Sequence, residues 1–290
     1  MKNVIEKELL GEVFHDIRKK RGLSMKEVGG CEITDSHISK FEKGNAMLSA
    51  DKLYYALSQM HMTPAEYGYL LNGNESSAYE KLLAQGWRYY YSADSEQLKK
   101  LIEKEASRGG KLKFDRLNLI VLKNLLSAID RNFVYASKED EAYLSDYFFD
   151  VDYWTTADVQ IFSSSLDLLS SYLIDKLIRE LLKSNYFSGI HDNDRRIKST
   201  LINVLAEFLS RKESAYFEGL EYAVSHIIKK EDVLEIACLN FLNAENQYLK
   251  TKDEMFKEKM RSIVSALGVI GAETHEKILQ LRIENIQKSN

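Results

Sequence analysis

Residues that interrupt helices are scarce in this chain of 290 residues. It contains one proline, Pro64, and 14 glycines. Few positions therefore force the backbone out of a helix, because proline and glycine are the two poorest helix formers. Apolar residues instead recur at steps of three and four along most of the chain, and no alternation of period two is sustained. The sequence predicts an almost entirely α-helical protein.

Cysteines and long apolar runs are also few, and each shortage excludes a class of protein. Cys31 and Cys238 are too few for a disulfide framework and too far apart for a short-spaced metal or redox motif. No run reaches about 18 apolar residues, the length that suggests a membrane-spanning helix. The charged N-terminus does not resemble a signal peptide. We therefore expect a cytoplasmic protein with no membrane span.

The net charge and the lack of catalytic motifs limit the functions that the sequence allows. The net charge of -4 argues against a generally basic nucleic-acid coat, although a local basic patch can still bind phosphate. No phosphate-binding glycine loop, H-E-x-x-H, C-x-x-C or nucleophile elbow is present. His191, Asp192 and Asp194 are close in sequence, but a polar loop before a helix explains them better than a metal site does. We expect no enzyme activity, no metal and no cofactor.

The first 73 residues contain signals for five short helices. The first has an apolar face and ends at Gly22, where glycine commonly follows a helix C-terminus. The third buries Ile38 and Phe41 and ends at Gly44. Glutamates placed three residues after two of the caps form capping boxes. The caps expected for the second to fifth helices are Ser24, Thr34, Ser49 and Thr63.

Two segments of this region resemble a known DNA-binding domain. "LGEVFHDIRKKRGLSMKEVGG" and "TDSHISKFEKGNAMLSADKLYYAL" are similar to the lambda-repressor-like helix-turn-helix domain of the XRE class, over residues 8–71. "SHISKFEKG", "LYYALSQMHMTPAEY" and "YLSDYFFDVDYWTTADVQIF" resemble, more narrowly, the Rgg/GadR/MutR regulators of Gram-positive bacteria. The resemblance implies that the third helix binds DNA in the major groove. It also implies a following tetratricopeptide-like α-helical repeat domain that senses a short peptide.

The chemistry of the same residues favours DNA binding. From Arg18 to Lys43 the sequence contains seven basic and four acidic residues, and so has a net positive charge. Basic patches of this kind supply most of the affinity of a protein for nucleic-acid phosphates. The N-terminal part of a recognition helix reaches the base edges. Lys40 could then donate to guanine. Asp35 could accept from a cytosine amine, or be only a first-turn acid favoured by the helix dipole. The candidate base-reading residues are Asp35, Ser36, His37 and Lys40.

The resemblance assigns further roles in this region. It implies that Arg18 and Glu42 form a structural ion pair between the first and third helices. It also implies that Ser24 and Lys43 contact phosphate. Lys26 belongs to the basic group, although a single lysine of this kind is ordinarily a solvated surface charge.

Gly73, Asn74, Ser76 and Ser77 predict a linker between a domain of residues 1–73 and one of residues 74–290. Polar breaks divide the second domain into stretches of about 12 to 18 residues, the lengths of helices in antiparallel pairs. Such hairpins stack into an extended concave surface that suits a short peptide.

Amide side chains are the candidate peptide ligands, because each offers a donor and an acceptor to a peptide backbone. Asn240, Asn243 and Gln247 share one helical stripe, and Asn203 occupies a similar position on the preceding "LINVLAEF" segment. Tyr222 is a nearby aromatic residue that could line a pocket. The alternative interpretation is that the amides face solvent and the aromatic residues fill the core.

These features predict a one-component transcription regulator that binds a promoter operator as a homodimer and senses a short peptide, with RNA polymerase as a further partner. Residues 255–286 are the candidate dimer face, or else the cap of the repeat stack. Two other functions stay open: a constitutive repressor whose second domain only oligomerises, and a helical-repeat scaffold for proteins. The apolar positions of residues 255–286 are Met260, Ile263, Val264, Leu267, Ile278 and Leu281.

Overall fold

The computed structural model describes residues 6–73, 78–109, 113–130, 135–184 and 191–288. Every regular element in these ranges is a helix, and no strand occurs in them, so the expected all-helical fold is confirmed. None of the helices described is long and apolar enough to cross a membrane. The chain forms two compact units, residues 1–85 and 86–290. The expected linker at residues 74–77 lies outside the described residues.

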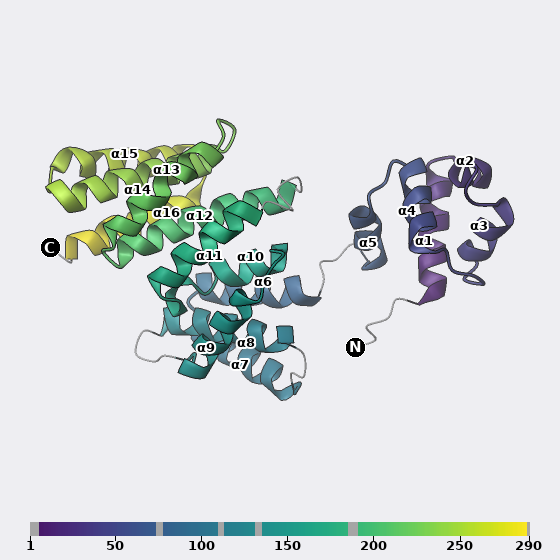
Figure 1. Cartoon of the computed structure of the whole chain (residues 1–290), viewed down its shortest axis with the longest axis horizontal. Helices are drawn as coiled ribbons and strands as arrows, with labels where there is room; N and C mark the ends of the chain where they lie inside the picture. Colours follow the sequence, from purple (N-terminus) through teal and green to yellow (C-terminus); the bar gives the residue numbers. More distant parts are fainter. Residues whose placement is uncertain (1–5, 74–77, 110–112, 131–134, 185–190, 289–290) are drawn as a thin grey trace. The chain divides into compact units, whose positions relative to one another are not determined.

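The first unit contains a bundle of five helices (Figure 1). They are α1 (Lys7–Lys20), α2 (Met25–Gly29), α3 (Asp35–Glu42), α4 (Ala50–Gln59) and α5 (Pro64–Leu71). Their N-termini follow the expected caps. Ser24 and Thr63 form complete capping boxes with Glu27 and Glu66, and the Thr34 hydroxyl accepts from the His37 N–H. Ser49 occupies the N-cap of α4, but its side chain makes no capping hydrogen bond.

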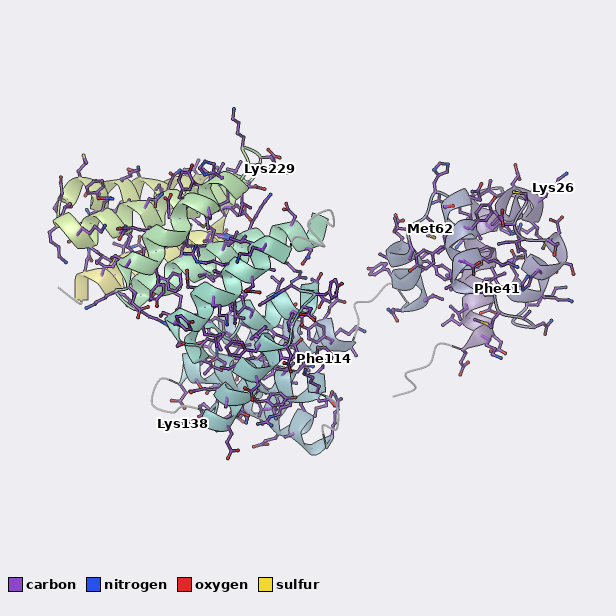
Figure 2. The ribbon with its side chains drawn as sticks, in the orientation of Figure 1. Lys26, Phe41, Met62, Phe114, Lys138 and Lys229 are labelled. Carbon is purple, nitrogen blue, oxygen red and sulfur yellow. The ribbon has the colours of Figure 1, made fainter. Side chains whose placement is uncertain are left out.

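The core of this bundle is built where α1 crosses α3. Phe14 and Phe41 meet edge to face, with their ring centroids 5.2 Å apart. Gly11 permits this approach, because a Cβ there would lie 2.1 Å from the carbonyl oxygen of Phe41. Figure 2 shows Phe41 inside the bundle and Lys26 at its edge. The interior of the first unit is therefore closely packed while the charged residues of α2 stay outside it.

The second unit is a stack of helices that pack mainly against their neighbours in the chain (Figure 1). Helix α6 (Ala78–Tyr91) contains the boundary between the units. The helices that follow are α7 (Ser95–Ser107), α8 (Lys113–Ile129), α9 (Lys138–Phe149), α10 (Thr156–Ser163), η1 (Leu166–Leu168), α11 (Ser171–Ser184), α12 (His191–Ser210), α13 (Ser214–Ile227), α14 (Val233–Thr251), α15 (Glu254–Val269) and α16 (Glu273–Lys288).

Most of the polar breaks in the sequence lie between these helices, but three connections carried too weak a signal to be expected. They are residues 164–170, 252–253 and 270–272. The first contains leucines that are buried in the fold, Leu166 and Leu169, so its apolar content resembles that of a helix.

The proposed dimer face is only partly exposed. Met260, Val264 and Leu267 are buried in the second unit, where α15 packs against α14 and α16. Ile278 and Leu281 of α16 are exposed. Three of the six apolar positions therefore belong to the core of this chain and are not available to a second copy, because the α14–α15–α16 packing covers them.

Candidate functional sites

A buried ion pair joins α1 to α3 in the first unit. Arg18 and Glu42 are only 2% and 8% exposed. Arg18 Nε donates to Glu42 Oε1 at 2.5 Å, and Nη2 donates to Oε2 at 2.8 Å. Arg18 Nη1 also donates to the Leu23 carbonyl at 2.8 Å. These are the two residues that the family resemblance pairs, and here they anchor the C-terminal end of α3.

Electrostatics reinforce this anchor. Burial alone raises the pKa of Glu42, but hydrogen bonds from Arg18 and His15 outweigh it and hold the pKa below the usual glutamate value. The hydrogen bond to Glu42 likewise raises the pKa of Arg18. The pair therefore stays ionised, and the end of α3 is fixed without using any side chain on its outer face.

That outer face carries three of the predicted base-reading residues. Asp35, Ser36 and Lys40 are exposed. Ser36 and Lys40 lie on the side of α3 opposite the buried Ile38 and Phe41, and Asp35 lies in the first turn at the edge of that side. Ser36 and Lys40 are one turn apart and so lie next to each other. A recognition helix needs such an arrangement, with one face in the core and short polar or basic side chains on the other.

The remaining residues predicted to contact DNA differ in whether they already have hydrogen-bond partners within the first unit. Lys26 and Lys43 are exposed. The Ser24 N–H and hydroxyl both donate to Glu27 Oε2, at 2.7 Å each. His37 is half-buried, and its Nε2 lies 3.3 Å from the Met47 carbonyl oxygen. Ser24 and His37 thus already hold the local structure, whereas the lysines extend into solvent.

The second unit contains a groove along one face of α12. Four adjoining hollows of about 470, 250, 280 and 350 Å³ share residues of this helix. Residues 196–210 extend about 21 Å along the helix axis at about 1.5 Å per residue. That is the length of about six residues of extended chain. The α12 residues that define this α12 groove are Arg196, Ser199, Asn203, Ala206 and Ser210.

The walls of the α12 groove come from helices that are distant in sequence, and they mix aromatic with polar side chains. Asn203 Nδ2 donates to Ser163 Oγ of α10 at 3.0 Å, and Arg196 Nη1 donates to Gln160 Oε1 at 3.4 Å. Such side chains suit the alternating donors and acceptors of a peptide backbone. Wall residues from the other helices include Trp87, Tyr90, Tyr91, Asn124, Asp167, Cys238, Glu245, His275, Ile278 and Arg282.

Arg282 of α16 forms hydrogen bonds to two other helices that line the groove. Its Nε donates to Glu245 of α14, its Nη1 to Ser210 Oγ at 3.1 Å, and its Nη2 to the Ala206 carbonyl at 2.7 Å. Burial raises the pKa of Glu245, which is 3% exposed, and Arg282 opposes that rise. One guanidinium therefore joins α12, α14 and α16.

The structure places Asn203 alone of the predicted peptide-binding residues in the groove. Asn243 Nδ2 donates to Glu221 of α13 at 3.0 Å, and Tyr222 is 72% exposed, with its ring 4.2 Å from that of His226. Asn240 and Gln247 are exposed on α14 and line none of the four hollows. This amide stripe lies on the solvent face of α14, a common result when polar residues recur at helical spacing.

Two groove residues that sequence reasoning missed are Asp167 and Arg282. Asp167 lies in the short η1 segment, and Arg282 is one of many charges on α16. Neither belongs to a motif, so only the tertiary contacts identify them. Among the described residues, no three His, Cys, Asp or Glu side chains are grouped so that they could hold a metal ion. The side chains of His191 and Asp192 lie outside the described residues.

Comparison with known proteins supports this two-part architecture. Residues 97–280 match the family model "HTH-type transcriptional regulator Rgg, C-terminal domain". The crystal structure of the Streptococcus dysgalactiae SHP pheromone receptor Rgg2 is similar, with a TM-score of 0.79 and 19% identity over 95% of this chain and 99% of that one.

Two further solved structures have the same fold. A Listeria monocytogenes EGD-e protein described as a transcriptional regulator has a TM-score of 0.81 and 15% identity, over 98% of both chains. PrgX in complex with cCF10 has a TM-score of 0.72 and 16% identity, over 96% of this chain and 99% of that one. The family model covers more than half of the sequence, and the chain therefore belongs to the Rgg family of HTH-type transcriptional regulators.

Proposed function

We propose that this protein is a cytoplasmic transcription regulator that binds promoter DNA through its first unit and a short peptide through the α12 groove. The observation that carries the proposal is the presence in one chain of both surfaces: the exposed face of α3 and a groove about six extended residues long. The solved relatives include an SHP pheromone receptor and a PrgX/cCF10 complex, which supports a peptide ligand.

In this proposal the α3 face reads the operator. Lys40 and Ser36 contact base edges, while Lys26 and Lys43 contact phosphates. Asp35 either accepts from a cytosine amine or only stabilises the first turn of α3. Two copies of the chain bind two half-sites of the operator, as two-fold helix-turn-helix dimers do, and RNA polymerase is a further partner at the promoter.

Peptide binding would act by differential affinity. A peptide that binds one arrangement of the second unit more tightly than another shifts the equilibrium between them. If the two arrangements hold the paired DNA-binding units differently, the peptide changes operator affinity, and DNA changes peptide affinity by the same factor.

The first test is DNA binding by the purified full-length protein to its own upstream region, at two salt concentrations. We expect specific binding that weakens as salt rises, because phosphate contacts release counterions. A Ser36→Ala/Lys40→Ala double variant should lose about tenfold or more in affinity, since each good base contact contributes about 1–3 kcal/mol of discrimination. Lys104→Ala, which removes an exposed lysine from α7, is the matched control and should bind as the wild type does.

The outcomes separate the proposed function from its alternatives. Equal binding by the wild type and the double variant would show that α3 is not the helix that reads the operator. No binding at either salt concentration would favour a protein scaffold. Operator binding that does not respond to any peptide that the protein binds would favour a constitutive repressor.

A further inference from the structure

One of the four hollows in the α12 groove has a distinctive lining. It has a volume of about 280 Å³ and lies where η1, α8 and α12 meet. This volume is below the range of about 300–1,000 Å³ typical of sites for whole ligands, and so it suits one side chain or one chain end. We call it the η1 pocket. Its polar and aromatic lining includes Trp87, Tyr90, Asn124, Asp167, Glu207 and Arg282.

The ionic partners in the η1 pocket leave one carboxylate without a counter-ion. Glu207 accepts a hydrogen bond from Arg211 Nε at 2.7 Å. Arg282 is paired with the buried Glu245. Asp167 forms no ion pair within the part of the chain that the structure describes, and its side-chain partner is the neutral Asn124 amide, whose Nδ2 donates to Oδ1 at 2.6 Å. Asp167 therefore has no ion-pair partner of its own in the pocket, although the nearby Arg211 charge, which is already paired with Glu207, also acts on it.

This carboxylate is open to solvent but surrounded by protein. The Asp167 side chain is exposed, yet desolvation raises its pKa. The Asn124 hydrogen bond and the Arg211 charge oppose this rise, and the Glu207 charge adds to it. Both observations are explained if Asp167 lies in an open concave part of the surface, where neighbouring residues surround the carboxylate and water still reaches it. A cation in the pocket would replace that water and offset both unfavourable effects.

Asn124 fixes the position of the Asp167 carboxylate. It is 5% exposed and lines the η1 pocket. Its amide group donates to the Ser164 carbonyl and to Asp167, but its Oδ1 accepts no hydrogen bond in the described part of the chain. Because Oδ1 is buried, a ligand in the pocket does not reach it, and the contribution of Asn124 is to hold the Asp167 carboxylate in place through Nδ2.

The aromatic wall fits a cation as well. Trp87 and Tyr90 lie edge to face, with their ring centroids 5.4 Å apart, and both line the η1 pocket. The faces of tryptophan and tyrosine attract ammonium and guanidinium groups, most strongly where water is excluded. A carboxylate and two aromatic rings around one small cavity are the groups that recognise a positively charged nitrogen.

We infer that the η1 pocket binds a positively charged nitrogen of the peptide, with Asp167 as its counter-ion and Trp87 and Tyr90 beside it. The nitrogen belongs to a lysine or arginine side chain or to the free N-terminal amine, which share this chemistry. The inference rests on the proposed peptide-sensing function. Arg282 does not oppose it, because its charge is neutralised by Glu245 and its remaining donors are bound to α12.

The test uses two synthetic libraries of random octapeptides, attached to beads through their C-termini, one with free and one with acetylated N-termini. The full-length wild type, Asp167→Asn, Asp167→Glu and the matched control Asp146→Asn, an exposed aspartate of α9, are each used to select binders. Thermal unfolding of each variant shows whether it folds as the wild type does.

A side-chain ligand predicts that wild type and Asp146→Asn enrich lysine or arginine at one position by about tenfold, the effect of one charge-assisted hydrogen bond. An N-terminal ligand predicts instead that acetylation abolishes binding. In either case Asp167→Asn should still select peptides but lose the preference, while Asp167→Glu keeps it.

Two results would count against these ideas, and they are distinguishable. If wild type selects peptides without any preference for a cation, or if Asp167→Asn keeps the preference, the inference is wrong while the proposed function stands. If neither wild type nor Asp146→Asn selects peptides from either library, the proposed peptide-sensing function fails and the inference fails with it.

Discussion

The two units of this protein carry their candidate sites in different ways. In the first unit, the α3 face that we propose reads DNA is a continuous stretch of eight residues, with a cap at Thr34 and a glycine at Gly44. In the second unit, the α12 groove takes its walls from helices that are as distant in sequence as α6 and α16. A site on one helix is encoded locally, whereas a site between helices depends on how the chain packs.

The units also differ in what their buried charges do. The Arg18–Glu42 pair lowers the pKa of its carboxylate, so the ionised form is favoured in the fold. In the groove, burial raises the pKa of Glu245 although Arg282 is bonded to it. The first pair therefore stabilises its unit as an anchor, whereas the second keeps a costly charge beside the α12 groove. Three experiments can test how the two units differ in what stabilises them.

The largest expected effect is the loss of the anchor. Arg18→Ala leaves Glu42 buried without its main partner, and breaking such a pair costs about 3–5 kcal/mol. We expect this loss in the first unit alone, measured as faster amide hydrogen exchange in peptides from residues 7–71 of the full-length protein.

Lys40→Ala is the control for the anchor, because it removes an exposed charge from α3. A surface change of this kind should alter stability by no more than about 0.5 kcal/mol. Equal effects of the two variants would mean that the pair does not hold α1 to α3.

A smaller effect is expected where the backbones of α1 and α3 come closest. Gly11→Ala should destabilise the first unit by about 1–3 kcal/mol, the usual cost of overpacking, because the new Cβ meets the Phe41 carbonyl. Gly68→Ala is the matched control within α5, since nothing lies within 4 Å of its added Cβ. It should stabilise the unit slightly through helix propensity. The difference in stability is measured by chemical denaturation of both variants, monitored through amide hydrogen exchange of peptides from the first unit.

The smallest effect is a difference in pH dependence between the units. The lowered pKa of Glu42 contributes stability that is present above the ordinary glutamate pKa of about 4.3 and is lost as the pH falls below it. The raised pKa of Glu245 has the opposite sign. Above the folded-state pKa of Glu245, the buried charge lowers the stability of the second unit. As the pH falls from that pKa towards about 4.3, the carboxylate is protonated in the fold and part of the lost stability returns.

Hydrogen exchange measured as a function of pH can separate these two contributions. Glu42→Gln should remove the loss of stability that acid causes in the first unit. Glu245→Gln should remove the gain of stability that acid causes in the second unit. A common pH dependence in both units, unaffected by the two substitutions, would contradict the assigned directions.

Local chemistry explains which expectations were confirmed. The capping boxes at Ser24 and Thr63 involve residues three apart, so the sequence alone shows them. Ser49 is also a residue type common at N-caps, but Lys52 stands where a capping box needs an acid, and the Ser49 side chain hydrogen-bonds to Asp51 without capping the helix.

Most helix boundaries marked by glycine or polar residues were predictable, although the short connections at residues 252–253 and 270–272 were missed. The connection through Leu166 was not predictable either, because its apolar residues join the core.

The groove shows the limit of this reasoning. The amide stripe of Asn240, Asn243 and Gln247 has the composition of a peptide site, but α14 turns a different face, with Cys238 and Glu245, towards the hollows. Periodicity shows that residues share a face of a helix. It does not show whether that face meets solvent, another helix or a cavity.

The sequence by itself determined the helical class, the family resemblance, the caps of the first unit and the residues on α3, because each depends on neighbours within one or two turns. Tertiary structure alone decided that Asn203, Asp167 and Arg282 line one groove. They come together because η1 packs against α12 and Arg282 of α16 hydrogen-bonds to α12 and α14, and such long-range contacts leave no pattern in any single stretch of sequence.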